Sequence, residues 1–202
     1  MRSRGIGCAW VRRSVAVRPW WSPARRATAP AGSGQQAGKT WLTSHGTGRF
    51  AAAVTDPHFT RVDSSAPLEH IEEWQHVHNT IIPAHFLSLD DVRERAGRHH
   101  LELAYDGRGL VGNSTVRPPE GDTATATVIV RVLAEHRGRG LGERLYERAL
   151  GRARELGART VETCVLESNE DGLRFALKHG FVEIDRYQLD GDTATWIDLR
   201  LT

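Results

Sequence analysis

The sequence predicts an α/β domain of mixed α+β character, in which a central mixed sheet of six or seven strands is flanked by about four helices. Two observations favour this class. Segments with alternating or β-branched apolar residues are interleaved with segments whose apolar residues recur at helical spacing. Strand–helix–strand units form parallel pairs, whereas strands joined by short turns form antiparallel hairpins, so both pairings are expected. The expected order is β-α-α-β-β-β-α-β-α-β-β.

The first part of the domain contains one short strand and two helices. The strand is expected near residues 59–62. Apolar positions at helical spacing then predict a helix that ends before Pro83: Ile71, Trp74, Val77 or His78, and Ile81. Ser88 and Asp91 predict the start of a second helix, because a serine N-cap and an acid in the first turn satisfy unpaired backbone N–H groups.

Three strands are expected next. Apolar residues alternate over residues 101–105, and a tight turn at residues 106–109 returns the chain through residues 110–116. Two prolines and a glycine in residues 118–122 predict a second turn. The strongly β-branched residues 123–133 predict a long strand.

Helices and strands alternate in the last part of the chain. A stripe of Leu and Ala predicts a helix at residues 141–156, and Gly157 suits its C-terminal end. A short strand is then expected at residues 159–166, followed by a helix closed by glycine at residues 169–179. The last element is a hairpin, with strands at residues 181–189 and 193–201 joined by a turn at residues 190–192.

Charge is distributed unevenly along the 202 residues. Residues 1–55 hold nine Lys and Arg residues and no acid, whereas residues 56–202 carry a net charge of −7. The first segment lacks helical or strand periodicity, so we expect a disordered basic extension at residues 1–55 and the folded domain at residues 56–202. A targeting segment also fits the Arg-rich composition, and a true start further downstream is the third interpretation.

Composition excludes several functional classes. No apolar run approaches 18 residues, so we expect no membrane partner. The acidic domain lacks the charge that binds nucleic acid, so nucleic acid is not an expected partner, although binding through the basic extension is the alternative. Cys8 and Cys164 give neither a disulfide framework nor a zinc site. We therefore expect a cytoplasmic protein without a metal.

A glycine-rich segment joins the long strand to the next helix: Arg137, Gly138, Arg139, Gly140, Leu141 and Gly142. Glycines let the backbone approach a ligand closely. The start of a helix presents unpaired N–H groups and the positive end of the helix dipole, so a pyrophosphate is a natural ligand. The two arginines would add positive charge beside it. An exposed basic turn is the alternative interpretation.

The sequence resembles the GNAT superfamily of N-acetyltransferases in two motifs. The first reads Arg or Gln, two residues, Gly, one residue, then Gly or Ala, and it is matched by Arg137, Gly140 and Gly142. The second is a strand, an Asn and a helix ending in Gly-Phe, matched by Asn169, Gly180 and Phe181. The resemblance covers about residues 59–201 and implies a single GNAT-like domain with acetyl-CoA as co-substrate.

The resemblance also implies roles for the matching positions. Backbone N–H groups of residues 138–142 would hold the CoA pyrophosphate. Val132 and Leu133 would pair with the pantetheine arm like an added strand. The Leu133 N–H would in addition polarise the thioester carbonyl as an oxyanion donor. Asn169 would hydrogen-bond the pantetheine, cap the helix that it opens, or do both.

The implied reaction is direct attack by a primary amine of a small molecule or protein on acetyl-CoA, with both substrates held in one cleft. The amine must first lose a proton. Glu167 is the predicted base, because it ends a strand and would point toward the cleft. Many family members carry a Tyr seven residues after the Asn to protonate the thiolate, and here that residue is Ala176, so Tyr146, Tyr187 or water would substitute.

These departures leave a second function open, a non-catalytic acyl-CoA-binding or sensor module of the same fold. The acidic domain weakly favours a cationic acceptor such as a polyamine or aminoglycoside. The last hairpin would also allow pairing across a homodimer.

Overall fold

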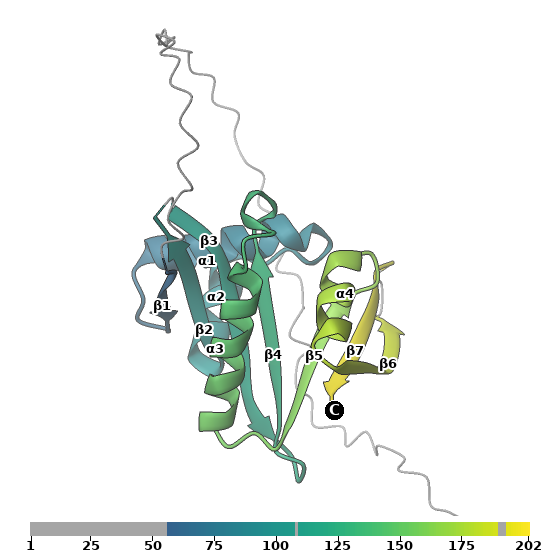
Figure 1. Cartoon of the computed structure of the whole chain (residues 1–202). Helices are drawn as coiled ribbons and strands as arrows, with labels where there is room; N and C mark the ends of the chain where they lie inside the picture. Colours follow the sequence, from purple (N-terminus) through teal and green to yellow (C-terminus); the bar gives the residue numbers. More distant parts are fainter. Residues whose placement is uncertain (1–55, 108, 190–192) are drawn as a thin grey trace, which may run out of the picture. The chain divides into compact units, whose positions relative to one another are not determined.

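A computed structural model describes residues 56–107, 109–189 and 193–202. The predicted extension at residues 1–55 and the predicted turn at residues 190–192 lie outside these ranges, as does Arg108 of the first turn. The described residues form a mixed seven-stranded sheet with four α-helices in the predicted order, which confirms the fold class (Figure 1). None of their helices is long and apolar enough to cross a membrane.

The bounds of the elements are as follows. The strands are β1 (His58–Val62), β2 (His100–Asp106), β3 (Gly109–Glu120), β4 (Thr125–Val132), β5 (Thr160–Leu166), β6 (Phe181–Gln188) and β7 (Thr195–Leu201). The helices are α1 (Leu68–Ile81), α2 (Leu89–Arg98), α3 (Leu141–Glu155) and α4 (Glu170–Lys178), with short 3₁₀ turns η1 (Pro83–His85) and η2 (Ala134–His136). Ser88 caps α2 in a capping box with Asp91, as expected.

The second turn begins later than the sequence predicted. β3 continues through two prolines to Glu120, and the turn follows at residues 121–124. The register of β3 against β4 shifts between Arg117 and Glu120. The prolines therefore lie where the ladder is interrupted, and their missing N–H groups cost no hydrogen bond there.

The sheet has the order β1-β2-β3-β4-β5-β7-β6, and β4 with β5 is its one parallel pair. This pair joins only residues 125–127 to residues 160–162. Beyond them the two strands diverge (Figure 1). From Val128 onward β4 is therefore paired on one edge only, with β3.

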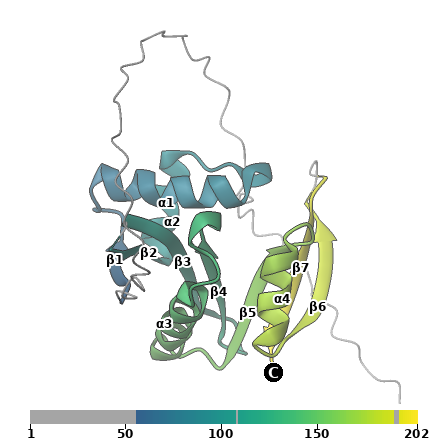
Figure 2. The ribbon, with the colours of Figure 1, turned by 45° about the horizontal axis from the view of Figure 1, so that its top comes forward.

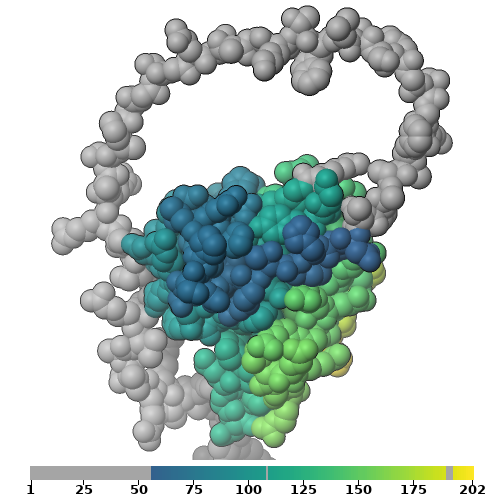
Figure 3. Space-filling model, turned by 90° about the vertical axis from the view of Figure 1, so that its left-hand side faces the viewer, coloured from purple at the N-terminus to yellow at the C-terminus, as the bar shows by residue number. Residues whose placement is uncertain are grey.

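Helices cover both faces of the sheet. Helices α1 and α2 lie on one face, and α3 and α4 lie on the other (Figure 2). Side chains such as Val128, Ala149 and Ile197 form the core under α3 and α4, whereas Trp74 packs with Leu101 under α1 and α2. At the β1 edge, the first described residues of the domain lie beside residues of α3 (Figure 3).

Candidate functional site

A cavity of about 600 Å³ lies where β4 and β5 separate. On one side its lining comes from the glycine loop and the helices α3 and α4, including Arg137, Gly138, Gly140, Gly142, Tyr146 and Asn169. On the other side it comes from the α1 face of the sheet and includes Ile82, Ile129, Arg131, Cys164, Leu166 and Trp196. The cavity therefore connects the two faces of the sheet through the gap between the strands.

The glycine loop has a backbone conformation that favours glycine. Gly138 and Gly140 have φ angles of 73° and 76°, in the left-handed region that other residues adopt only with strain. Gly140 is the N-cap residue of α3, and no side chain caps this helix. The first N–H groups of α3 therefore have no side-chain acceptor.

Gly142 keeps the cavity open beside this helix start. A Cβ atom at this position would lie 3.5 Å from the Phe175 ring and 3.9 Å from the Val132 side chain, which is ordinary contact. A methyl group therefore fits, but a longer side chain would extend into the space that Gly142 lines.

Only one of the two loop arginines faces the cavity. Arg137 lines it, donates from Nε to the Val132 carbonyl at 3.1 Å, and pairs with Asp171 at 3.3 Å. Arg139 pairs with Asp106 at 3.4 Å and contacts His136, away from the lining. The side chain of Leu141 is buried in the core, so this residue can offer a ligand only its backbone.

The edge of β4 that faces the gap is defined by its pairing with β3. The Leu133 N–H donates to the Val111 carbonyl at 3.0 Å, so it is already used by β3 and does not face the gap. In an antiparallel ladder the backbone groups of successive residues alternate between the two edges. Val132 and Val130 therefore direct their N–H groups into the gap, whereas the Leu133 N–H, which was predicted as an oxyanion donor, does not reach it.

Asn169 caps α4, because its Oδ1 accepts a hydrogen bond from the Gly172 N–H at 3.1 Å. The same side chain belongs to the cavity lining. Capping and ligand binding are thus compatible, since the side-chain amide NH₂ group is separate from the oxygen that caps the helix.

Glu167 does not reach the cavity, contrary to the sequence prediction. It follows β5 in a turn, its N–H donates to the Thr195 carbonyl at 2.9 Å, and its half-exposed carboxylate pairs with Arg186 of β6. The geometry gives no support for Glu167 as a base.

Two tyrosines were candidates for the missing proton donor, and only one lines the cavity. Tyr146 on α3 lies among Phe175, His179 and Phe181. Burial raises the pKa of its hydroxyl, so it remains protonated at neutral pH. Tyr187 instead donates to Asp198 at 3.3 Å and lies outside the lining.

Sequence reasoning missed the polar residues on the α1 side of the cavity. Arg131 is only 7% exposed and lies over the Trp74 ring, 5.7 Å from its centroid. In the sequence, the one indication of this residue was a single charge within a predicted strand of β-branched residues. Cys164 also lines the cavity, and burial raises the pKa of its thiol. Among the residues placed by the structure, no group of three His, Cys, Asp or Glu could hold a metal.

The sequence profile of the Acetyltransferase (GNAT) family matches residues 59–181. The chain belongs to this family. No curated protein sequence matches the chain.

Several solved structures share the fold of this GNAT domain. An N-acetyltransferase from Staphylococcus aureus Mu50 is 18% identical at a TM-score of 0.56, covering 73% of this chain and 98% of that chain. A variant of the spermidine N-acetyltransferase SpeG from Vibrio cholerae is 15% identical at a TM-score of 0.56, covering 72% and 92%. The protein yncA from Salmonella typhimurium, solved with its cofactor acetyl-CoA, is 16% identical at a TM-score of 0.55, covering 73% and 94%.

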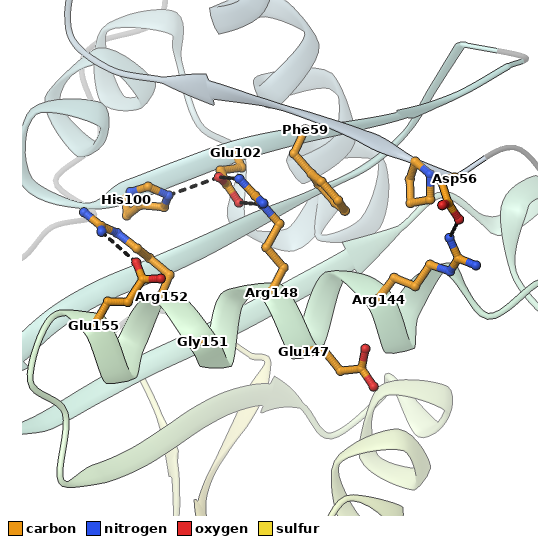
Figure 4. A pocket seen from close by; sticks show the side chains of 11 residues that line it. Asp56, Phe59, His100, Glu102, Arg144, Glu147, Arg148, Gly151, Arg152 and Glu155 are labelled. Carbon is orange, nitrogen blue, oxygen red and sulfur yellow. Dashed lines mark hydrogen bonds and ion pairs between the residues drawn. The ribbon is translucent and has the colours of Figure 1, made fainter.

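A second cavity of the GNAT domain, of about 900 Å³, lies between α3 and the β1 edge (Figure 4). Most of its charged side chains are paired with one another. Glu102 accepts hydrogen bonds from Arg148 Nε and Nη2 at 2.9 and 2.8 Å and lies 3.2 Å from His100 Nε2. Arg144 pairs with Asp56, and Arg152 with Glu155. This cavity shares no lining residue with the cavity at the glycine loop.

Proposed function

We propose that the chain transfers an acetyl group from acetyl-CoA to a primary amine, with both substrates bound in the cavity between β4 and β5. The observation that carries this proposal is the coincidence of three features in one cavity. These are an uncapped helix start with a glycine loop, an unpaired strand edge, and an opening to the opposite face of the sheet. Membership of an acetyltransferase family supports the same reaction.

The residues present suit two parts of acetyl-CoA, the pyrophosphate and the pantetheine arm. The first N–H groups of α3, the loop backbone at Gly138 and Gly140, and Arg137 would hold the pyrophosphate. The pantetheine arm contains two amides, and the N–H and C=O groups of Val130 on the open edge of β4 suit them as a strand partner would. Asn169 would add a side-chain hydrogen bond. Acetyl-CoA supplies the acetyl thioester.

The reaction forms a carbon–nitrogen bond and breaks a carbon–sulfur bond. The nitrogen loses a proton and the departing thiolate gains one. An N–H at Val132 would stabilise negative charge that develops on the acetyl oxygen. The lining carboxylates, Glu143 and Asp171, are both ion-paired near the glycine loop, so water rather than a carboxylate takes the amine proton in this proposal.

Tyr146 is the proposed donor of the proton to the thiolate, in place of the Tyr absent at Ala176. We expect Tyr146→Phe to lower kcat by about 100-fold with little change in the KM for acetyl-CoA, because it removes a hydroxyl and keeps the ring. Steady-state kinetics of purified protein would measure both constants. Tyr187→Phe is the matched control and should leave kcat within a factor of about 2. Equal kinetics for wild type and Tyr146→Phe would remove Tyr146 from the mechanism.

The proposal is tested first by two measurements on the full chain. We expect acetyl-CoA to bind in calorimetry, and a panel of amines to release free CoA thiol. The panel should span apolar amino acids, spermidine and peptides with a free N-terminus, because the acceptor class is open at this stage. Binding of acetyl-CoA without thiol release from any amine would instead support the acyl-CoA-binding or sensor function. Failure of acetyl-CoA to bind to folded protein would contradict both.

A further inference from the structure

The α1 side of the cavity presents hydrogen-bond donors without partners. Arg131 donates from Nη1 to Asn113 at 3.3 Å, but its Nε has no hydrogen-bond partner among the described residues. Trp196, which is 6% exposed, likewise has an unpartnered Nε1. Both residues line the cavity. Buried polar atoms are rarely left without partners, so a ligand that supplies acceptor atoms would complete this site.

The charge on this side is positive and uncompensated by acids at close range. Burial, opposed by Cys164 and aided by repulsion from Arg95 and Arg117, lowers the pKa of Arg131 to about 9, so the guanidinium stays charged at neutral pH. No carboxylate of the described chain is among the groups that shift it. A buried cation without an ion-pair partner is costly, and a bound anion removes that cost.

The other walls of this part of the cavity are apolar. They include Ile81, Ile82, Ile129 and Leu166 together with the Trp196 ring. Spermidine and similar polyamines need carboxylates, and the lining offers none on this side. The acidic net charge of the domain, which weakly favoured a cationic acceptor, is therefore not reflected at the site.

We propose that the acceptor is an α-amino acid with an apolar side chain, or a close analogue, whose carboxylate binds Arg131. This inference rests on the proposed acetyl transfer. Arg131 and Val132 line the same cavity, so an anion held by the guanidinium shares that cavity with the strand edge that would bind the thioester. An α-amino acid carries its carboxylate one carbon from the amine, so one small acceptor can present both groups within it. The apolar walls then accommodate the side chain, and Trp196 Nε1 offers a second donor.

Matched pairs of acceptors test this inference in the wild-type protein. The pairs are leucine with 3-methylbutylamine and phenylalanine with 2-phenylethylamine, which differ in the carboxylate alone. We expect kcat/KM to be on the order of 100-fold higher for the amino acid of each pair. Leucinamide controls for amine basicity, because its amine is less basic than that of leucine but it has no carboxylate. It should react like the simple amine. Equal or better turnover of the amines lacking a carboxylate would overturn the inference.

Variants of Arg131 test whether this side chain causes the preference for acceptors with a carboxylate. Arg131→Met should remove most of the preference, with little change for 3-methylbutylamine, and Arg131→Lys should retain part of it. Both variants should bind acetyl-CoA within about 3-fold of wild type, and thermal unfolding would report their folding. A preference that persists in folded Arg131→Met contradicts the assignment.

If the chain binds acetyl-CoA but acetylates no amine, the proposed reaction is wrong. The carboxylate site is then tested by binding alone. In that case calorimetry of leucine and of 3-methylbutylamine into protein saturated with CoA shows whether the carboxylate is bound. Leucine binding that is lost in Arg131→Met supports a carboxylate site without transfer, and absence of leucine binding overturns the inference.

Discussion

Gly142→Glu is expected to weaken acetyl-CoA binding by at least 100-fold. Gly142 lies in the first turn of α3 and lines the cavity, and a carboxylate there occupies the place of the pyrophosphate and repels it. Calorimetry of acetyl-CoA into wild type and variant would measure the change. Gly142→Gln has nearly the same size without the charge, so comparison of the two separates steric exclusion from repulsion.

Gly142→Ala is the matched control for this experiment. Its methyl group meets the Phe175 ring at ordinary contact distance, and alanine stabilises a helix relative to glycine. We therefore expect folding and acetyl-CoA binding close to those of wild type. Wild-type affinity in a folded Gly142→Glu chain would mean that the loop is a turn with no role in binding.

Arg148→Ala is expected to destabilise the domain by about 3 kcal/mol, because it leaves the carboxylate of Glu102 buried without its bidentate partner (Figure 4). The Arg148 guanidinium also lies 4.6 Å from the centre of the Phe59 ring, and that contact is lost as well. Urea unfolding at neutral pH measures the loss. Arg144→Ala removes the exposed pair with Asp56 from the same helix face and should cost no more than about 0.5 kcal/mol.

The Glu102 interaction predicts a particular dependence on pH. Burial by itself would raise the pKa of this carboxyl, but hydrogen bonds from His100 and Arg148 outweigh it and lower the pKa to about 2. A carboxyl whose pKa is depressed on folding contributes stability above its unfolded pKa, and this contribution is lost as pH falls toward the folded value. The difference between wild type and Arg148→Ala should therefore shrink between about pH 5 and pH 2. A difference that stays constant over this range would assign the loss to packing against Phe59.

Local patterns sufficed to predict the order of elements and the glycine loop, because helical spacing, β-branched runs and glycines act within short segments. The direction in which single groups point depends on register between distant strands. Leu133 bonds β3 rather than the gap, because residue 111 lies opposite residue 133, and a shift of one residue would reverse the two edges. Glu167 turns to Arg186, because β6 and β7 add to the sheet beside β5.

The position of the Arg131 side chain could not be predicted from local patterns either. The sequence placed a single charge in a buried strand, but the face on which it lies follows from the register and from the packing of Trp74. Its unpartnered Nε depends on which side chains surround it from α1, β3 and β7, and these are far apart in the sequence.

The ladder between β4 and β5 has only three residue pairs in the described chain, so most of this edge of β4 has no neighbouring strand. The N–H groups of Ile129 and Arg131 bond β3, whereas those of Val130 and Val132 face the gap, so we expect amide exchange to alternate between slow and fast along this strand without ligand. A ligand that bridges the gap would act as an intervening strand. Slowed exchange at Val130 and Val132 would then report a bound ligand independently of any chemical turnover.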